Sequence, residues 1–332
     1  MPVRFKGLIW VAAIGAVALG AMGPASAQAI QERTIRWGHL NNTDHPVSKG
    51  VQKFAEIVAA KSGGKLKVRE YPANQLGSEM QQQSALRAGT QEMQSPATTS
   101  LVGIVKDYGL IDFPFIVSTP QQADALLDGP LGAALLAKLP EKGLVGLAYW
   151  DLGFRNVTNS KRAITRGEDL GGIKIRVIPN PVYLETFKAF NANPVPMSFS
   201  ELYSALETGT VDGQENPLSV ITSAKLDQVQ KYLTLTGHVY SPAVILMSKA
   251  QWDKLSAADK QSFNDAAKEA VKANRARIDD DEKKAVADLR AKGMQVVENV
   301  DKAKFQAALA PTFADFGKKF GQDNIDRIRN YK

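Results

Sequence analysis

Cysteine is absent from this chain of 332 residues. Its absence excludes disulfides, thiolate nucleophiles and metal sites with cysteine ligands. Histidine is scarce as well: His39, His45 and His238 lie far apart, without an acidic neighbour at the spacing of metal ligands. We therefore expect no zinc site and no cofactor, and we expect a hydrophobic core rather than cross-links to hold the protein together.

The common catalytic motifs are also missing. The sequence contains no G-x-S-x-G, no H-E-x-x-H, no Walker A loop and no dinucleotide-binding G-x-G-x-x-G. Its only S-x-x-K runs from Ser62 to Lys65, where a turn between a helix and a strand is expected. These absences favour a binding protein over an enzyme.

Long apolar runs are confined to the N-terminus. Arg4 and Lys6 precede an apolar run over residues 8–19, and residues 24–27 are Pro-Ala-Ser-Ala. This order is typical of a secretory signal peptide, and the run is shorter than the ~20 residues that a membrane-spanning helix needs. We expect residues 1–27 to be a signal peptide cleaved after Ala27, with no lipid anchor because no cysteine could carry one.

The charge of the chain is mildly positive. Its net value of +7 falls to +5 when Arg4 and Lys6 leave with the signal peptide, and Lys and Arg are interspersed with Asp and Glu. This pattern predicts a weak attraction for anions and no binding to nucleic acid. The mature chain of roughly 300 residues has the length of two ordinary domains.

Hydrophobic periodicity predicts an α/β fold. A strand over residues 33–40 precedes a helix with Val47, Val51, Phe54 and Val58 at spacings of three and four. A second strand and turn over residues 64–77 and a helix over residues 79–93 follow. The chain therefore opens as β-α-β-α, which indicates layers of helices on a sheet.

Capping signals place further helices along the chain. Thr119 and Gln122 have capping-box spacing with Pro120 at the first helical position. Ser198 and Glu201 repeat the pattern at the start of a helix that ends at Gly209. The sequence also predicts a long helix over residues 256–292 and a single amphipathic helix over residues 313–332.

Three polar side chains stand out near the predicted strands. Arg155 lies among aromatic residues, where its charge would be desolvated and would need a partner. Arg176 interrupts a short strand whose other face carries Ile175 and Val177, and Asn216 falls in a turn-rich segment after a capped helix. Because ligand contacts in α/β folds gather in turns that follow strands, we expect these groups to bind a ligand.

Four segments resemble a known family. "IRVIPNPVY", "NPVPMSFSELYSALETGTVDGQENP", "YPANQLG" and "DFPF" are similar to the periplasmic substrate-binding subunits of tripartite ATP-independent periplasmic (TRAP) transporters, the DctP-type family. The resemblance runs from about Thr34 to the C-terminus. It implies two α/β lobes joined by hinge strands, with a long C-terminal helix spanning both lobes. It also implies a monomeric periplasmic receptor that closes on an organic acid and delivers it to a TRAP membrane permease.

The resemblance also implies domain boundaries and site residues. Residues 28–150 would form mainly the first lobe, residues 151–245 mainly the second, and residues 246–332 the helices that pack across both. In the family, the arginine that matches Arg176 forms the salt bridge to the ligand carboxylate, for which a guanidinium is better suited than an ammonium. The other implied ligand contacts are Arg155, Asn216, Phe199, Glu79, Asn42, His45 and Tyr240.

The substrate is expected to be a sugar acid. Sialate-binding relatives carry an acidic residue near the position of Pro96, which this chain lacks, and this difference counts against sialate as the ligand. Dicarboxylate-binding members commonly carry lysine where this chain has Arg155, which weakens the case for a C4-dicarboxylate. The segments over residues 144–164 and 241–249 resemble members that bind hexuronates, so we expect glucuronate or galacturonate. The alternatives are a C4-dicarboxylate receptor, a secreted sugar-acid enzyme that uses Glu79 with His45, and a receptor that reports to a membrane sensor kinase.

Overall fold

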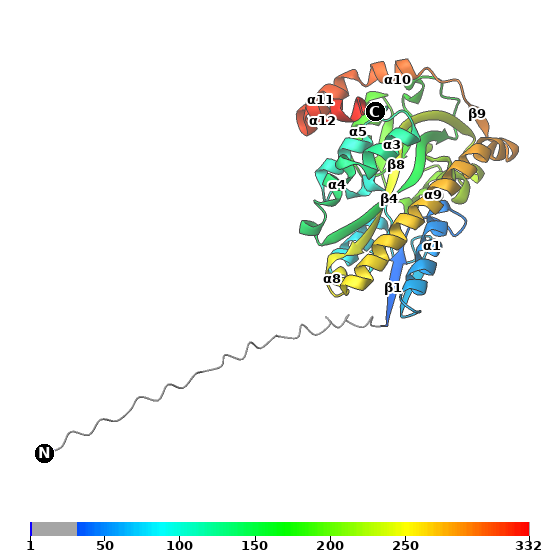
Figure 1. Cartoon of the computed structure of the whole chain (residues 1–332). Helices are drawn as coiled ribbons and strands as arrows, with labels where there is room; N and C mark the ends of the chain where they lie inside the picture. Colours follow the sequence, from blue (N-terminus) through cyan, green and yellow to red (C-terminus); the bar gives the residue numbers. More distant parts are fainter. Residues whose placement is uncertain (2–31, 332) are drawn as a thin grey trace.

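The computed structural model describes residues 1 and 32–331. The predicted signal peptide, with its cleavage site, lies outside this range apart from Met1. The described residues form a mixed α/β structure of two lobes (Figure 1). Within residues 32–331, no helix has both the length and the apolar character needed to cross a bilayer.

The first lobe confirms the predicted β-α-β-α order, although its second helix ends at Arg87 and not near residue 93 as predicted. Its elements are β1 (Arg33–Gly38), α1 (Pro46–Lys61), β2 (Leu66–Tyr71), α2 (Glu79–Arg87) and β3 (Met93–Gln94). Strand β1 pairs in parallel with both β2 and β3. The apolar face of α1 is buried as its periodicity predicts, and Phe54 packs edge-on against Trp37 of β1.

Two long strands connect the lobes. Strands β4 (Leu144–Asn159) and β8 (Tyr232–Ser248) are antiparallel neighbours at the centre of a sheet with the order β2-β1-β3-β8-β4-β7-β5-β6. One half of this pair continues the sheet of the first lobe through β3, and the other half continues the sheet of the second lobe through β7. The register of β4 against β8 shifts between Asp151 and Gly153, where Gly153 has a φ of +105°.

The second lobe repeats the alternation of strands and helices. Its elements are β5 (Lys174–Val177), α5 (Pro181–Ala189), β6 (Asn193–Pro196), α6 (Phe199–Glu207), β7 (Gly213–Pro217) and α7 (Leu218–Ser223). Strand β5 lies between β6 and β7 and is parallel to both. The buried side chains of this lobe form a core of their own, which includes Ile175, Val177 and Phe187.

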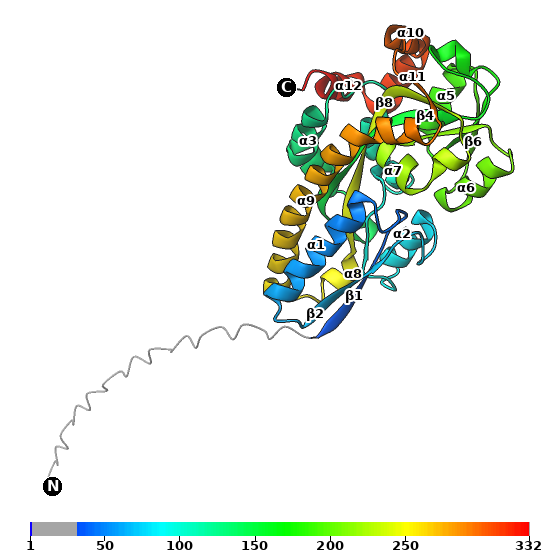
Figure 2. The same cartoon turned by 90° about the vertical axis from the view of Figure 1, so that its right-hand side faces the viewer.

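The predicted long helix is present as α9 (Ala257–Ala291) and spans both lobes (Figures 1 and 2). Near its start, Phe263 and Ala267 belong to the core of the first lobe together with residues of α1. Near its end, Ala285 and Leu289 pack with α6 of the second lobe. One rigid element therefore contacts the cores of both lobes.

The remaining elements cover the sheet and the second lobe. They are α3 (Pro120–Asp128), α4 (Pro130–Leu136), α8 (Lys249–Trp252), β9 (Gln295–Val297), α10 (Lys302–Ala308), α11 (Ala310–Phe320) and α12 (Gln322–Arg329). Residues 32–331 also contain short 3-10 turns at Thr98–Leu101, Lys106–Asp112, Pro140–Lys142, Gly167–Leu170 and Leu226–Gln228. Strand β9 extends the sheet by pairing with β8.

The predicted starts of α3 and α6 are confirmed, whereas the predicted cap of α6 and the single C-terminal helix are wrong. Thr119 accepts the predicted hydrogen bond from the backbone of Gln122. Helix α6 starts where expected, but the Ser198 hydroxyl bonds to Ser200 instead of capping the helix. The predicted single C-terminal helix is two helices, because Gly321 has a φ of +85° and ends α11.

Candidate ligand-binding site

Five of the predicted site residues line one cavity between the lobes. The second lobe and strand β4 provide Arg155, Arg176, Phe199 and Asn216, and α2 of the first lobe provides Glu79. The other lining residues are Leu40, Asn41, Ala97, Leu152, Ile178 and Val220. The cavity is therefore built by groups from both lobes.

Arg155 and Asn216 lie on strands rather than in the turns that we predicted. The predicted turn-rich segment around Asn216 is strand β7, which pairs with the second half of β4. Arg155 lies inside β4, two residues after the register shift at Gly153. The strand partner of each segment is distant in sequence, so local turn signals did not reveal the pairing.

Arg176 is a buried cation that forms no ion pair with any residue that the structure describes. Its side chain is 2% exposed, its Nε donates to the carbonyl of Met197 at 2.9 Å, and its guanidinium lies 5.9 Å from the centre of the Phe199 ring. Its Nη1 has no hydrogen-bond partner among the residues that the structure describes. Burial, together with the nearby charge of Arg155, lowers the pKa of Arg176 to about 10. A bound anion would accept a hydrogen bond from Nη1 and would compensate the buried positive charge.

Arg155 has the partner that its environment requires. Its Nε and Nη2 donate to the two carboxylate oxygens of Glu215 at 2.5 and 2.9 Å, and both side chains are buried. Its Nη1 donates to Ser241 Oγ at 3.2 Å, and Nη2 also donates to Asn216 Oδ1 at 3.1 Å. Although burial raises the pKa of Glu215, Arg155 and His238 hold it below its usual value. The charge of Arg155 is therefore balanced within the protein.

Acceptor groups of the first lobe face the arginines. Glu79 is partly buried, its Oε1 accepts from the backbone of Ala97 at 3.0 Å, and desolvation raises its pKa to about 7 against the opposing effect of Ala97 and both arginines. The Oδ1 of Asn41 is buried without a hydrogen-bond partner among residues 32–331. These atoms can accept hydrogen bonds from hydroxyl groups of a ligand.

Asn42, His45 and Tyr240 lie outside the lining of this cavity. Asn42 Nδ2 donates to the carbonyl of Ser223 at 2.7 Å, and His45 Nε2 lies 3.2 Å from Ser219 Oγ, so both contact α7 of the second lobe. Tyr240 is buried against Phe154, with ring centres 5.1 Å apart. The roles of these three residues as ligand contacts stay predictions, and the structure gives each another contact.

Comparison with known proteins identifies the family. Residues 37–319 match the family described as bacterial extracellular solute-binding protein, family 7 (DctP). The chain belongs to this family. Over 304 residues it is 47% identical to a solute-binding protein of Verminephrobacter eiseniae, covering 92% of this chain and 91% of that protein.

Solved structures of TRAP periplasmic receptors share the fold of this family 7 protein. One from Polaromonas sp. JS666, bound to D-erythronate, is 42% identical with a TM-score of 0.89, covering 91% of this chain and 99% of that one. The sugar acid binding protein of Advenella mimigardefordensis, in complex with galactonate, is 39% identical with a TM-score of 0.89, covering 91% and 98%. The predicted TRAP family and its two-lobed fold are confirmed.

Sequence reasoning missed several groups at the site of this family 7 receptor. Glu215 was not singled out, although the predicted need of Arg155 for a partner pointed to a buried carboxylate. Asn41 was passed over in favour of its neighbour Asn42. All three histidines are accounted for by contacts within the protein: His39 pairs with Glu70, His45 with Ser219, and His238 with Glu215.

Proposed function

We propose that this receptor binds a sugar acid, a monocarboxylate with several hydroxyl groups, in the cavity between its lobes. The observation that supports this most directly is the guanidinium of Arg176, which is buried, has an unpartnered Nη1 and forms no ion pair within residues 32–331. A carboxylate offers two acceptor oxygens in the plane that a guanidinium recognises. A ligand carboxylate at this position would balance the charge of Arg176.

The balance of charge favours a ligand with one carboxylate. Of the two buried arginines, Arg155 is already paired with Glu215, which leaves one positive charge for the ligand. A C4-dicarboxylate would bring two negative charges, and its second one would lie near the Glu79 carboxyl across the cavity. Like charges in a desolvated site repel, whereas hydroxyls would donate to Glu79 and to the free Oδ1 of Asn41.

Two solved relatives support the same chemistry, because erythronate and galactonate each carry one carboxylate and several hydroxyls. Glucuronate and galacturonate, the acids expected from the sequence, have the same combination of groups on a ring. In the proposed function the receptor is exported to the periplasm, binds one of these acids as a monomer and delivers it unchanged to a TRAP membrane permease.

A thermal-shift and titration panel tests this proposal. The panel contains D-galactonate, D-erythronate, D-galacturonate, D-glucuronate, succinate and L-malate. A ligand at a hundredfold excess over its Kd raises the free energy of unfolding by about 2.7 kcal/mol, which produces a clear rise in melting temperature. We expect at least one sugar acid to bind more tightly than both dicarboxylates, and tighter binding of succinate than of every sugar acid would contradict the substrate class.

The enzyme alternative is tested separately. In the structure, Glu79 lines the arginine cavity, whereas His45 lies outside its lining. The receptor should return galacturonate and galactonate unchanged after prolonged incubation, as followed by NMR. Formation of a product would contradict the receptor function.

A further inference from the structure

A chain of hydrogen bonds connects the two lobes beside the arginine cavity, which neither His45 nor Ser219 lines. His45 Nδ1 accepts from the backbone N–H of Val47 at 3.1 Å, so the proton of a neutral ring resides on Nε2. Nε2 then donates to Ser219 Oγ at 3.2 Å, and the Ser219 hydroxyl donates to the carbonyl of Leu152 at 3.0 Å. The chain thus joins α1 of the first lobe, α7 of the second lobe and the connecting strand β4.

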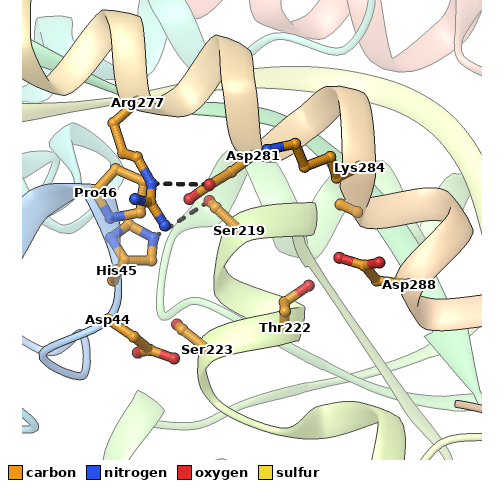
Figure 3. Close-up of a pocket in the computed structure, with 11 residues that line it drawn as sticks. Asp44, His45, Pro46, Ser219, Thr222, Ser223, Arg277, Asp281, Lys284 and Asp288 are labelled. Atoms are coloured by element: carbon orange, nitrogen blue, oxygen red, sulfur yellow. Dashed lines mark hydrogen bonds and ion pairs between the residues drawn. The ribbon is translucent and has the colours of Figure 1, made fainter.

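The surroundings of His45 keep its ring neutral. Its side chain is 1% exposed, and burial together with the charge of His39 lowers its pKa to about 3, so the ring is neutral at physiological pH. Figure 3 shows the ring pointing from the first-lobe segment toward Ser219 on α7, beneath the side chains of α9. The adjacent cavity of about 280 Å³ is lined by residues of both lobes, His45 and Ser219 among them, and by residues of α9.

A second contact reinforces the first. Asn42 Nδ2 donates to the carbonyl of Ser223 at 2.7 Å, one helical turn beyond Ser219. Within the loop, the backbone N–H of His45 donates to the carbonyl of Asn42 at 3.1 Å, so both contacts come from one ordered segment of the first lobe. The two side chains therefore hold α7 at two points.

We propose that His45 and Ser219 are positioning residues that latch the two lobes in the closed arrangement without touching the ligand. Leu152, which accepts the last hydrogen bond of the chain, lines the arginine cavity, and so does Val220, the neighbour of Ser219. Helix α7 begins directly after β7, which carries Asn216. Because the contact joins residues of different lobes, separation of the lobes at this point would break it, so the proposed latch stabilises the closed state selectively and raises the affinity for any ligand that needs closure.

This mechanism makes a distinctive prediction about selectivity. A latch that touches no ligand should change the affinity for different acids by the same factor, whereas a direct ligand contact should change them unequally. The loss of one neutral hydrogen bond lowers affinity by about tenfold. We expect His45→Asn and Ser219→Ala each to weaken D-galactonate and D-erythronate by about tenfold, with the ratio of the two affinities unchanged.

The variants are chosen to separate the latch from local stability. Asparagine is a favoured N-cap, so His45→Asn keeps an acceptor for the N–H of Val47 but is too short to reach Ser219. The double variant should bind no more weakly than about the weaker single variant, since either change alone breaks the contact. Ser262→Ala is the matched control, because its hydroxyl donates to Ala258 within α9, and it should leave binding unchanged.

A direct measurement of closure completes the test. Because the chain has no cysteine, Glu56→Cys on α1 and Glu207→Cys on α6 allow one spin label on each lobe. We expect Ser219→Ala and His45→Asn to shift the interlobe distance distribution toward longer distances, both in the free protein and with saturating D-galactonate.

The proposal depends on the proposed function only for its choice of probe acids. If the parent binds neither D-galactonate nor D-erythronate, the proposed substrate class fails, and the distances in the free protein still decide about the latch. Unchanged distance distributions in both variants would overturn the latch. A changed ratio of the two affinities would overturn it as well, since His45 or Ser219 would then act on the ligand itself.

Discussion

The carboxylate of Glu215 accepts hydrogen bonds from Nε and Nη2 of Arg155 at 2.5 and 2.9 Å, and the side chains of both residues are buried. Removing one member of a buried ion pair leaves the other uncompensated, which destabilises a protein by about 3 to 5 kcal/mol. Glu215→Gln should therefore lower the free energy of unfolding by this order, as measured by urea denaturation. Glu298→Gln, which breaks the exposed pair with Arg290, should change it by less than about 1 kcal/mol.

The same Glu215→Gln variant should alter ligand preference. With its partner neutral, Arg155 would present a second positive charge to the cavity. Provided that the variant remains folded, calorimetric titration should show succinate gaining affinity relative to D-galactonate. An unchanged ratio would mean that the charge of Arg155 does not reach the ligand.

Arg176 should affect binding and stability in different ways. Arg176→Ala should weaken binding by about 2 to 5 kcal/mol, because the ligand carboxylate loses its desolvated partner, and Arg176→Lys should restore only part of it. The unliganded variant should be no less stable than the parent, since it removes a buried cation that forms no ion pair within residues 32–331. Titration and thermal melts measure the two effects. Binding by Arg176→Ala within a few-fold of the parent would contradict the proposed site.

The pKa of Glu79 predicts a dependence of stability on pH. The folded protein raises this pKa from 4.5 to about 7, so the folded chain binds more protons than the unfolded chain between these values. The contribution of Glu79 to the free energy of unfolding should fall as pH rises from about 4.5 to about 7 and stay low above that. Because the side chain is only partly buried, we expect a change on the order of 1 to 2 kcal/mol.

Glu79→Gln isolates this contribution. Asp112, Asp124 and Glu282 also have pKa values raised to about 7 by burial, so the parent curve alone is not diagnostic. The difference in stability between variant and parent should shift in favour of the variant from pH 5 to pH 8. A constant difference across this range would show that Glu79 titrates normally.

Glu79→Gln should also separate the two classes of acid. An amide accepts hydrogen bonds from ligand hydroxyls less strongly than a carboxylate, so sugar acids should bind more weakly by roughly 1 to 3 kcal/mol. Succinate and malate should bind unchanged or more tightly, because the repulsion from the carboxylate is removed. Titration of D-galactonate and succinate against parent and variant at pH 8, where the Glu79 carboxyl is mostly ionised, measures both effects.

The sequence revealed those parts of the site that local patterns encode. The apolar spacing of Val47, Val51 and Phe54 predicted α1, and the motif around Arg176 identified the guanidinium whose Nη1 has no hydrogen-bond partner within residues 32–331. By contrast, Glu215 lies diagonally across from Arg155 in the pairing of β4 with β7, in a register that no local signal fixes.

The contacts of residues 41–45, the loop before α1, were equally hidden. Asn41 and Asn42 are chemically identical neighbours, and only the path of the backbone directs Asn41 to the cavity and Asn42 to Ser223. The contact of His45 with Ser219 joins residues 174 positions apart. Such pairings depend on how the two lobes meet, which is a property of the assembled fold rather than of any segment.

Strands β4 and β8 each contribute to both lobes, so neither lobe is a continuous stretch of chain. Strand β3 pairs with β1 on one edge and with the C-terminal end of β8 on the other, where Met93 lies opposite Met247. A fragment ending near residue 150 would expose the edge of β3 and should not fold by itself. The first lobe therefore also needs β8 and the start of α9, and contacts this distant in sequence predict slow refolding compared with a helical bundle of similar size.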